Sequence, residues 1–158
     1  MSAQPSQFAT LFDKPDRGIM RKLSPRDFER FVAYVLRRAG FDVKEVGRNF
    51  LRGLDLELRL PGKQQIFGGV ECKRYTEDRP VRVPAVRGVR GAAAVKRRGA
   101  KPFVITTSDF VPDAHKEAHA DKSKIVHLMN GAQLLRFITY VKGSRHGFAS
   151  KVDSHSDF

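Results

Sequence analysis

Two stretches in which charged and apolar residues alternate constrain the fold of this chain most. They cover residues 54–60 and 65–75, and the turn-forming pair Pro61-Gly62 lies between them. Alternation with a period of two is typical of β-strands, because successive side chains point to opposite faces of a sheet. Proline followed by glycine favours a tight turn. The pattern therefore predicts a β-hairpin in the middle of the sequence.

This hairpin would bring charged side chains together at one edge of the sheet. Glu71 and Lys73 share a face of the second strand, whereas Cys72 points to the other face, towards a core. If the strands pair, Asp55 reaches the same position as Glu71. Such a group can hold a divalent metal and activate a water beside a phosphate. Glu57 is the alternative carboxylate, and an ordinary charged hairpin face is the alternative interpretation.

Helices and further strands are predicted around the hairpin. A helix begins at the cap Ser24 with Pro25 in its first turn, and it ends at Gly40. The apolar, β-branched run 103–107 is typical of a buried central strand. The other predicted helices cover residues 84–98, 112–121 and 133–140, and the other predicted strands cover residues 41–46 and 125–128. This order predicts an α/β protein with a central mixed β-sheet flanked by helices on both faces.

We expect a single folded domain over residues 23–142. The 158 residues of the chain are enough to bury a core. Residues 1–22 show no clear periodicity, so we expect a flexible N-terminal arm. Residues 143–158 are mainly Gly, Ser, His and Asp with scattered apolar residues, so we expect a flexible C-terminal tail.

The charge balance indicates a polyanionic partner. Lys and Arg number 30 against 17 Asp and Glu, which gives a formal net charge of +13. A surplus of this size is typical of nucleic-acid-binding proteins. No apolar stretch approaches the ~20 residues of a membrane span, and the N-terminal residues lack the apolar region of a secretion signal. The single cysteine fits a reducing compartment, so we expect a cytoplasmic protein.

Much of the positive charge follows the hairpin directly. No acidic residue occurs from position 79 to position 108. Basic side chains there would contact the phosphate backbone, which positions a protein without reading the base sequence. A solvated basic helix face is the alternative interpretation. The candidate nucleic-acid contacts are Arg74, Arg79, Arg82, Arg87, Arg90, Lys96, Arg97 and Arg98.

Four segments in order resemble a known family. They are the opening helix L-S-P-R-D-F-E-R-F, the G-x-D strand, the E-C-K-R-Y strand and the V-I-T-T-S strand. Together they resemble the Mrr-type restriction endonuclease catalytic domain of the PD-(D/E)xK nuclease superfamily. The resemblance extends from about Leu23 to Ile138 and implies a restriction-endonuclease-like fold.

The resemblance implies a role for each candidate side chain. Asp55 and Glu71 would coordinate Mg²⁺, for which Mn²⁺ would substitute, and Lys73 would lie beside the attacking water. Glu29 matches a glutamate of the opening helix that relatives place near the metal. Gln64 or Gln65 would help to position the substrate. The sequence departs from the family before Asp55, where residues 49–52 replace the usual Gly and Asp.

Two further groups have simpler explanations. His115 and His119 lie four residues apart on a predicted helix, but no third zinc ligand accompanies them. The hydroxyl residues 106–108 have no base partner in the sequence, so they are predicted to end a buried strand.

The sequence thus predicts a metal-dependent DNA endonuclease, related to restriction and defence enzymes, that uses a metal-activated water. Cleavage of both strands of a duplex predicts a homodimer, and a partner protein would assist target recognition. One alternative is a Holliday-junction or branched-DNA resolvase, because such enzymes share the implied fold. Another is a catalytically inactive DNA-binding subunit of a larger complex. The presence of Asp55, Glu71 and Lys73 argues against the inactive subunit.

Overall fold

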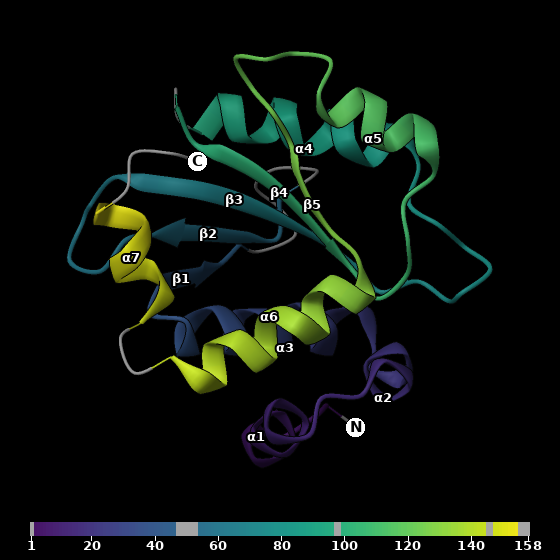
Figure 1. Cartoon of the computed structure of the whole chain (residues 1–158), viewed down its shortest axis with the longest axis vertical. Helices are drawn as coiled ribbons and strands as arrows, with labels where there is room; N and C mark the ends of the chain where they lie inside the picture. The colour runs from purple at the N-terminus through teal and green to yellow at the C-terminus, as the bar shows by residue number, and fades with distance from the viewer. Residues whose placement is uncertain (1, 47–53, 97–98, 145–146, 155–158) are drawn as a thin grey trace.

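A five-stranded mixed sheet forms the centre of the protein (Figure 1). The computed structural model describes residues 2–46, 54–96, 99–144 and 147–154. The strands follow the sequence order across the sheet. β1, β2 and β3 are antiparallel, and β3, β4 and β5 are parallel. The strand bounds are β1 Asp42–Glu45, β2 Leu56–Arg59, β3 Ile66–Lys73, β4 Lys101–Thr106 and β5 His127–Met129.

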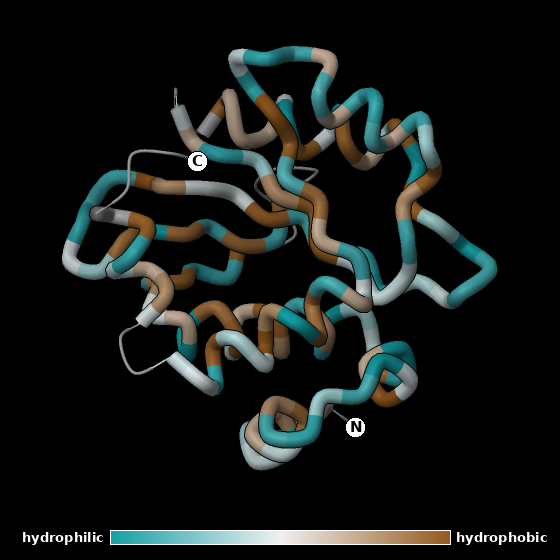
Figure 2. The backbone as a smooth tube through the Cα atoms, viewed as in Figure 1, coloured by the Kyte–Doolittle hydropathy of each residue, from teal (hydrophilic) through white to brown (hydrophobic). Residues whose placement is uncertain are grey.

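Helices cover both faces of this sheet, which confirms the predicted fold class. In Figure 1, α4 and α5 lie on one face, α3 and α6 lie on the other, and α1 and α2 lie outside α3 and α6. Figure 2 shows brown, apolar segments on the strands and on the helices beside them. The helix bounds are α1 Pro5–Asp13, α2 Arg17–Lys22, α3 Pro25–Arg38, α4 Val83–Lys96, α5 Pro112–Ala118, α6 Gly131–Gly143 and α7 Phe148–Ser154.

Alternation along the strands separates two apolar cores. Val70 and Cys72 of β3 face the larger core, which contains Phe28 and Phe31 of α3. Val104 of β4 faces the smaller core beneath α4 and α5. The predicted orientation of Cys72 is therefore confirmed.

Helix α3 starts and ends as its sequence predicts. The Ser24 side chain accepts a hydrogen bond from the backbone N–H of Asp27 at 3.0 Å, and Pro25 occupies the first turn. The chain leaves the helix through Gly40 at a φ of 101°, which costs a glycine little.

The N-terminal segment differs from the flexible arm that we expected. Helices α1 and α2 occupy most of residues 1–22, and Phe8, Phe12 and Met20 are buried. The Phe12 ring lies 5.8 Å from the ring of Tyr34 on α3. Helices this short gain their stability from packing, so local periodicity gave no clear signal.

The C-terminal segment also differs from the expected tail over its described part. Residues 148–154 form α7, in which Ala149 and Val152 are buried. The Phe148 ring lies 5.3 Å from Phe137 of α6 and 6.1 Å from Phe41. Aromatic contacts between distant segments therefore hold this helix. Residues 155–158 lie outside the described residues.

Two glycines inside α4 are expected to weaken that helix. A Cβ atom added at Gly88 or Gly91 would meet no heavy atom within 4 Å. We therefore expect Gly88→Ala and Gly91→Ala each to raise the free energy of unfolding by about 0.5–1 kcal/mol. Chemical denaturation measures this change. Gly40→Ala is the control and should destabilise the protein, because its φ is 101°. Unchanged stability in both α4 variants would contradict the account.

Candidate active site

Two backbone hydrogen bonds fix Asp55 against β3. The N–H of Asp55 donates to the carbonyl of Val70 at 2.8 Å, and the N–H of Cys72 donates to Asp55 Oδ2 at 2.7 Å. Leu56 pairs with Val70 in the sheet, so Asp55 lies where β2 begins, beside the carboxyl end of β3. The carboxylate is thus held beside the backbone of Glu71 and Cys72.

Glu71 and Lys73 form an ion pair on the neighbouring strand. Lys73 Nζ lies 2.7 Å from Glu71 Oε1, and Glu71 is only 7% exposed. Burial lowers the pKa of Lys73, but the hydrogen bond and charge of Glu71 outweigh burial, and the net pKa is raised. Lys73 therefore carries a positive charge at neutral pH.

Asp55 is a carboxylate that its surroundings make hard to ionise. Its pKa is raised to about 7, mainly by burial and further by the negative charges of Glu71 and Glu29. The Cys72 N–H and the Lys73 charge oppose it. A cation beside Asp55 and Glu71 would relieve this repulsion.

The oxygen donors fit a hard divalent cation. Mg²⁺ is commonly held by one or two carboxylates, together with waters and substrate phosphates. Asp55 and Glu71 supply such a pair. Within the described residues, no cluster of three or more His, Cys, Asp or Glu side chains is arranged around a common point.

Glu29 on α3 acts on the candidate site through its charge. Its side chain is 16% exposed and accepts a hydrogen bond from Arg26 at 3.1 Å. The charge of Glu29 raises the pKa of Asp55 and contributes to the raised pKa of the buried Cys72 thiol. The opening helix therefore places a negative charge near the site. Cys72 itself is a protonated core residue.

The competing carboxylate and the two glutamines lie elsewhere. Glu57 is 2% exposed and pairs with Arg59 at 3.4 Å. Gln64 and Gln65 precede β3 at its opposite end, roughly 25 Å from Lys73 at ~3.3 Å per residue. The structure therefore does not bring the glutamines to the candidate site.

The predicted nucleic-acid contacts that the structure describes divide into three groups. Arg79 and Arg82 are exposed, and the Arg79 guanidinium lies 4.2 Å above the Tyr75 ring. Arg74 donates to the carbonyl of Arg21 at 3.2 Å. Arg87 and Arg90 contact Glu117 on α5 at 3.1 and 3.0 Å, so a carboxylate already offsets their charge. The Lys96 side chain, Arg97 and Arg98 lie outside the described part of the chain.

Hydroxyl groups brace the end of the sheet beside Lys73. Thr106 Oγ1 donates to the Lys73 carbonyl at 2.6 Å, and Thr107 Oγ1 donates to the Tyr75 carbonyl at 2.7 Å. Thr107 Oγ1 also accepts from the Tyr75 N–H at 2.9 Å. These side chains fix the backbone that carries Lys73, which agrees with the prediction that they end a strand.

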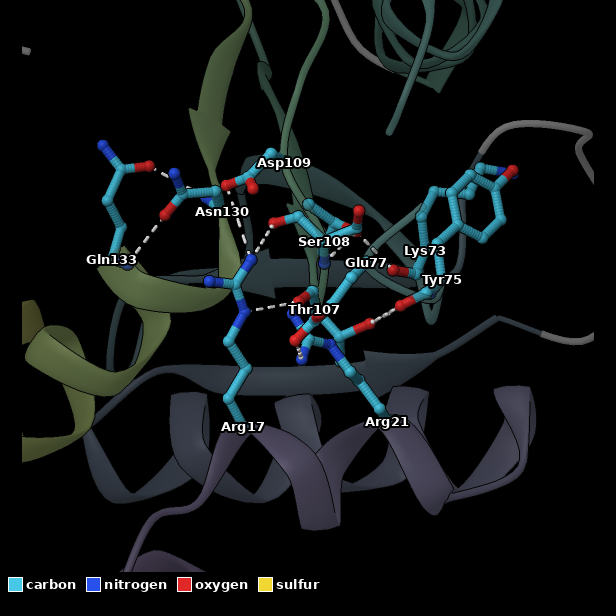
Figure 3. Close-up of polar contacts among 11 residues, drawn as sticks. Arg17, Arg21, Lys73, Tyr75, Glu77, Thr107, Ser108, Asp109, Asn130 and Gln133 are labelled. Atoms are coloured by element: carbon cyan, nitrogen blue, oxygen red, sulfur yellow. Dashed lines mark hydrogen bonds and ion pairs between the residues drawn. The ribbon is translucent and has the colours of Figure 1, made fainter. Parts of the chain in front are cut away.

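Sequence reasoning missed two arginines of α2 at this end of the sheet (Figure 3). Arg17 donates to the carbonyls of Thr107 and Ser108 at 2.8 and 2.9 Å, and Arg21 pairs with Glu77. Arg17 and Thr107 are separated by 90 positions, so no local pattern indicates the contact.

Loss of the Arg17 contacts is expected to destabilise the protein. Arg17→Ala would leave two carbonyls of buried residues without these donors, which should lower the free energy of unfolding by about 2 kcal/mol. Urea denaturation measures the change. Lys14→Ala, at a nearby exposed position, is the control and should change it by less than about 0.5 kcal/mol. Equal effects would contradict the proposed brace.

The segments that contain these site residues match a known family. Residues 20–138 match Mrr_cat, described as a restriction endonuclease. The chain belongs to the Mrr_cat family. The match includes Glu29, Asp55, Glu71 and Lys73, all five strands of the sheet, and the helices α3, α4 and α5.

A solved restriction endonuclease structure shares the fold of this Mrr_cat member. The DNA modification-dependent restriction endonuclease AspBHI aligns over 97% of this chain and 39% of its own, with 20% identity and a TM-score of 0.60. MspJI restriction endonuclease in complex with a 27-mer oligonucleotide aligns over 97% and 35%, with 20% identity and a TM-score of 0.44. The chain thus spans well under half of either protein. No curated protein sequence matches it. Among the described helices, none is long and apolar enough to cross a membrane.

Proposed function

We propose that this chain is a metal-dependent DNA endonuclease that hydrolyses phosphodiester bonds. One observation carries the proposal: the Asp55 carboxylate is clamped beside the Glu71–Lys73 ion pair, in a chain of the restriction endonuclease family. Asp55 and Glu71 would hold Mg²⁺, or Mn²⁺ in its place. The bound ion would supply Lewis acidity and lower the pKa of a bound water.

Each side chain then has a chemical task. The Lys73 ammonium would orient the attacking water and stabilise the negative charge that develops on the phosphate. The negative charge of Glu29 on α3 would increase the preference of the site for a cation. The exposed Arg79 and Arg82, with Arg74, would contact the flanking phosphates.

Restriction-like cutting of a duplex requires two such sites, so we propose that the protein forms a homodimer. We also propose that it acts in the cytoplasm. Phosphate contacts carry no sequence information. Selection of the target therefore rests on the structure or modification of the DNA, or on a partner protein.

A comparison of DNA substrates tests the proposal. Linear duplex, supercoiled plasmid and a labelled four-way junction are incubated with Mg²⁺, Mn²⁺ or EDTA, and the product ends are analysed. We expect metal-dependent cutting of the duplex substrates with 5′-phosphate and 3′-hydroxyl ends. Preference for the junction would instead support a resolvase. Salt-sensitive binding without any product would support a DNA-binding subunit.

A further inference from the structure

A basic cavity lies at the opposite end of the sheet from the candidate active site. Its volume is about 230 Å³, and the first residue of β4, Lys101, forms part of its wall. All the charged side chains in its lining are basic. They are Arg90, Lys101, Lys122 and Lys124, and His127 also lines the cavity.

The sheet register separates this cavity from the candidate active site. Lys101 pairs with Gly68, whereas Thr106, at the other end of β4, pairs with Lys73. Five steps along a strand at ~3.3 Å place Lys101 about 16 Å from Thr106. A group bound in the cavity would therefore not touch Asp55 or Glu71.

Contacts of Arg90 and of Asp121 fix the cavity wall. Arg90 pairs with Glu117 and donates to the carbonyl of Lys124 at 3.3 Å. The Asp121 carboxylate accepts hydrogen bonds from the N–H and hydroxyl of Ser123 at 2.9 and 2.6 Å. These bonds hold the segment that carries Lys122 and Lys124.

Glu117 offsets Arg90. Hydrogen bonds from Ser123 lower the pKa of the Asp121 carboxylate, and the charges of Arg90 and Lys124 help to lower it. Four basic side chains of the lining therefore face two acidic ones, and the three lysines come from two separate segments. Lys122 and Lys124 are exposed, whereas Lys101 is half-buried. The His127 ring is stacked on Phe103 with centroids 4.9 Å apart. Burial lowers the pKa of His127, and the charges of Lys101 and His119 lower it further, as expected in a region of positive potential.

We infer that this cavity binds a phosphate group, and that its source is the backbone of a nucleic acid passing the far end of the sheet. Lysine ammonium groups are point charges that suit phosphate, and a hollow with more basic than acidic side chains attracts an anion. The choice of nucleic acid as the source rests on the proposed function. The binding site itself rests on the cavity and its charges.

A charge-matched pair of variants tests the inference. One variant is K101Q/K122Q/K124Q, and the control is K14Q/K44Q/K116Q, which removes the same charge at exposed positions elsewhere. Binding to a 30-base-pair duplex is measured in EDTA by fluorescence anisotropy over a range of salt concentrations. Thermal melts establish that both variants fold. The NMR signals of the His127 ring, recorded with and without duplex, report binding at the cavity directly.

For the cavity variant we expect the slope of log K against log salt to fall in magnitude by about two, and affinity near 0.1 M salt to fall at least about tenfold. The control should change both quantities by less than half as much. Duplex should also shift the His127 signals. Equal losses in the two variants, or unshifted His127 signals, would overturn the inference.

Binding of inorganic tripolyphosphate distinguishes a site for the nucleic-acid backbone from a site for a free phosphate compound. A backbone site should bind it only weakly, at millimolar concentration. Micromolar binding that shifts His127, with an unchanged DNA slope in the cavity variant, would assign the cavity to a free phosphate compound and overturn the backbone assignment. A wild type that binds no duplex would refute the proposed function, and the tripolyphosphate signals would still test the cavity.

Discussion

Asp55→Asn is expected to lower the rate of phosphodiester cleavage at least about 10³-fold at saturating Mg²⁺, which corresponds to about 4 kcal/mol of transition-state stabilisation. The amide keeps the size of the side chain and can still accept the hydrogen bond from the Cys72 N–H. It removes the negative charge that would hold the metal beside Glu71. Initial rates of plasmid nicking measure the loss.

Glu57→Gln is the matched control for this variant. Glu57 lies two residues further along the same segment, but it is buried and paired with Arg59. Its substitution should lower stability and change the cleavage rate of the folded protein by less than about tenfold. A greater loss of activity in Glu57→Gln than in Asp55→Asn would show that Glu57, and not Asp55, holds the metal.

Asp55 also predicts how metal-free stability depends on pH. Its folded-state pKa is about 7, above the ordinary 3.8. Between these values the folded protein holds a proton that the unfolded chain releases, so the free energy of unfolding falls as pH rises. We expect a loss of about 3 kcal/mol between pH 4 and pH 7, or about 9 °C in Tm. Below about pH 4 Asp55 is protonated in both states, so the free energy of unfolding no longer changes with pH through this group.

Thermal melts of wild type and Asp55→Asn in EDTA isolate that contribution, because the amide does not titrate. The variant should lose less stability over the same pH range. Added Mg²⁺ should raise the Tm of the wild type near pH 7 and leave that of the variant almost unchanged. Parallel pH curves for the two proteins would contradict the assignment of the raised pKa to Asp55.

Lys73→Met is expected to lower the cleavage rate by about 10²–10³-fold with little change in DNA affinity. Methionine keeps the length of the side chain but removes the positive charge next to the reacting phosphate. The charge has its largest effect when negative charge develops, so kcat should fall far more than KM rises. Single-turnover rates and binding in EDTA separate the two quantities.

Lys116→Met, at an exposed position on α5, is the control for the loss of one positive charge. It should leave the rate within about twofold of wild type. Lys73→Arg keeps the charge and should recover part of the activity. A Lys73→Met protein with wild-type kcat and weakened binding would show that Lys73 contacts DNA without taking part in the chemistry.

The sequence could predict the centre of the fold because local patterns there agree with the tertiary structure. Period-two alternation located β2 and β3, and the capped, amphipathic pattern after Ser24 located α3. The same alternation placed Glu71 and Lys73 on one face. The Cys72 N–H that holds Asp55 became visible only with the register of the two strands.

The remaining features depend on contacts between distant segments. Helices α1 and α2 are held by packing of buried side chains, and Arg17 finds its partners 90 positions away. The basic stretch from position 79 to 108 contains no acid, yet Glu117 on α5 approaches Arg87 and Arg90. Counting charges along the sequence could not reveal that pairing.

Cleavage of supercoiled plasmid by the wild type, with Mg²⁺ or with EDTA and alongside Asp55→Asn, shows whether Asp55 takes part in metal-dependent hydrolysis. We expect nicked and linear products with Mg²⁺, none with EDTA, and at least about 10³-fold slower cutting by the variant. Equal cutting with Mg²⁺ and EDTA, or by wild type and variant, would contradict this expectation.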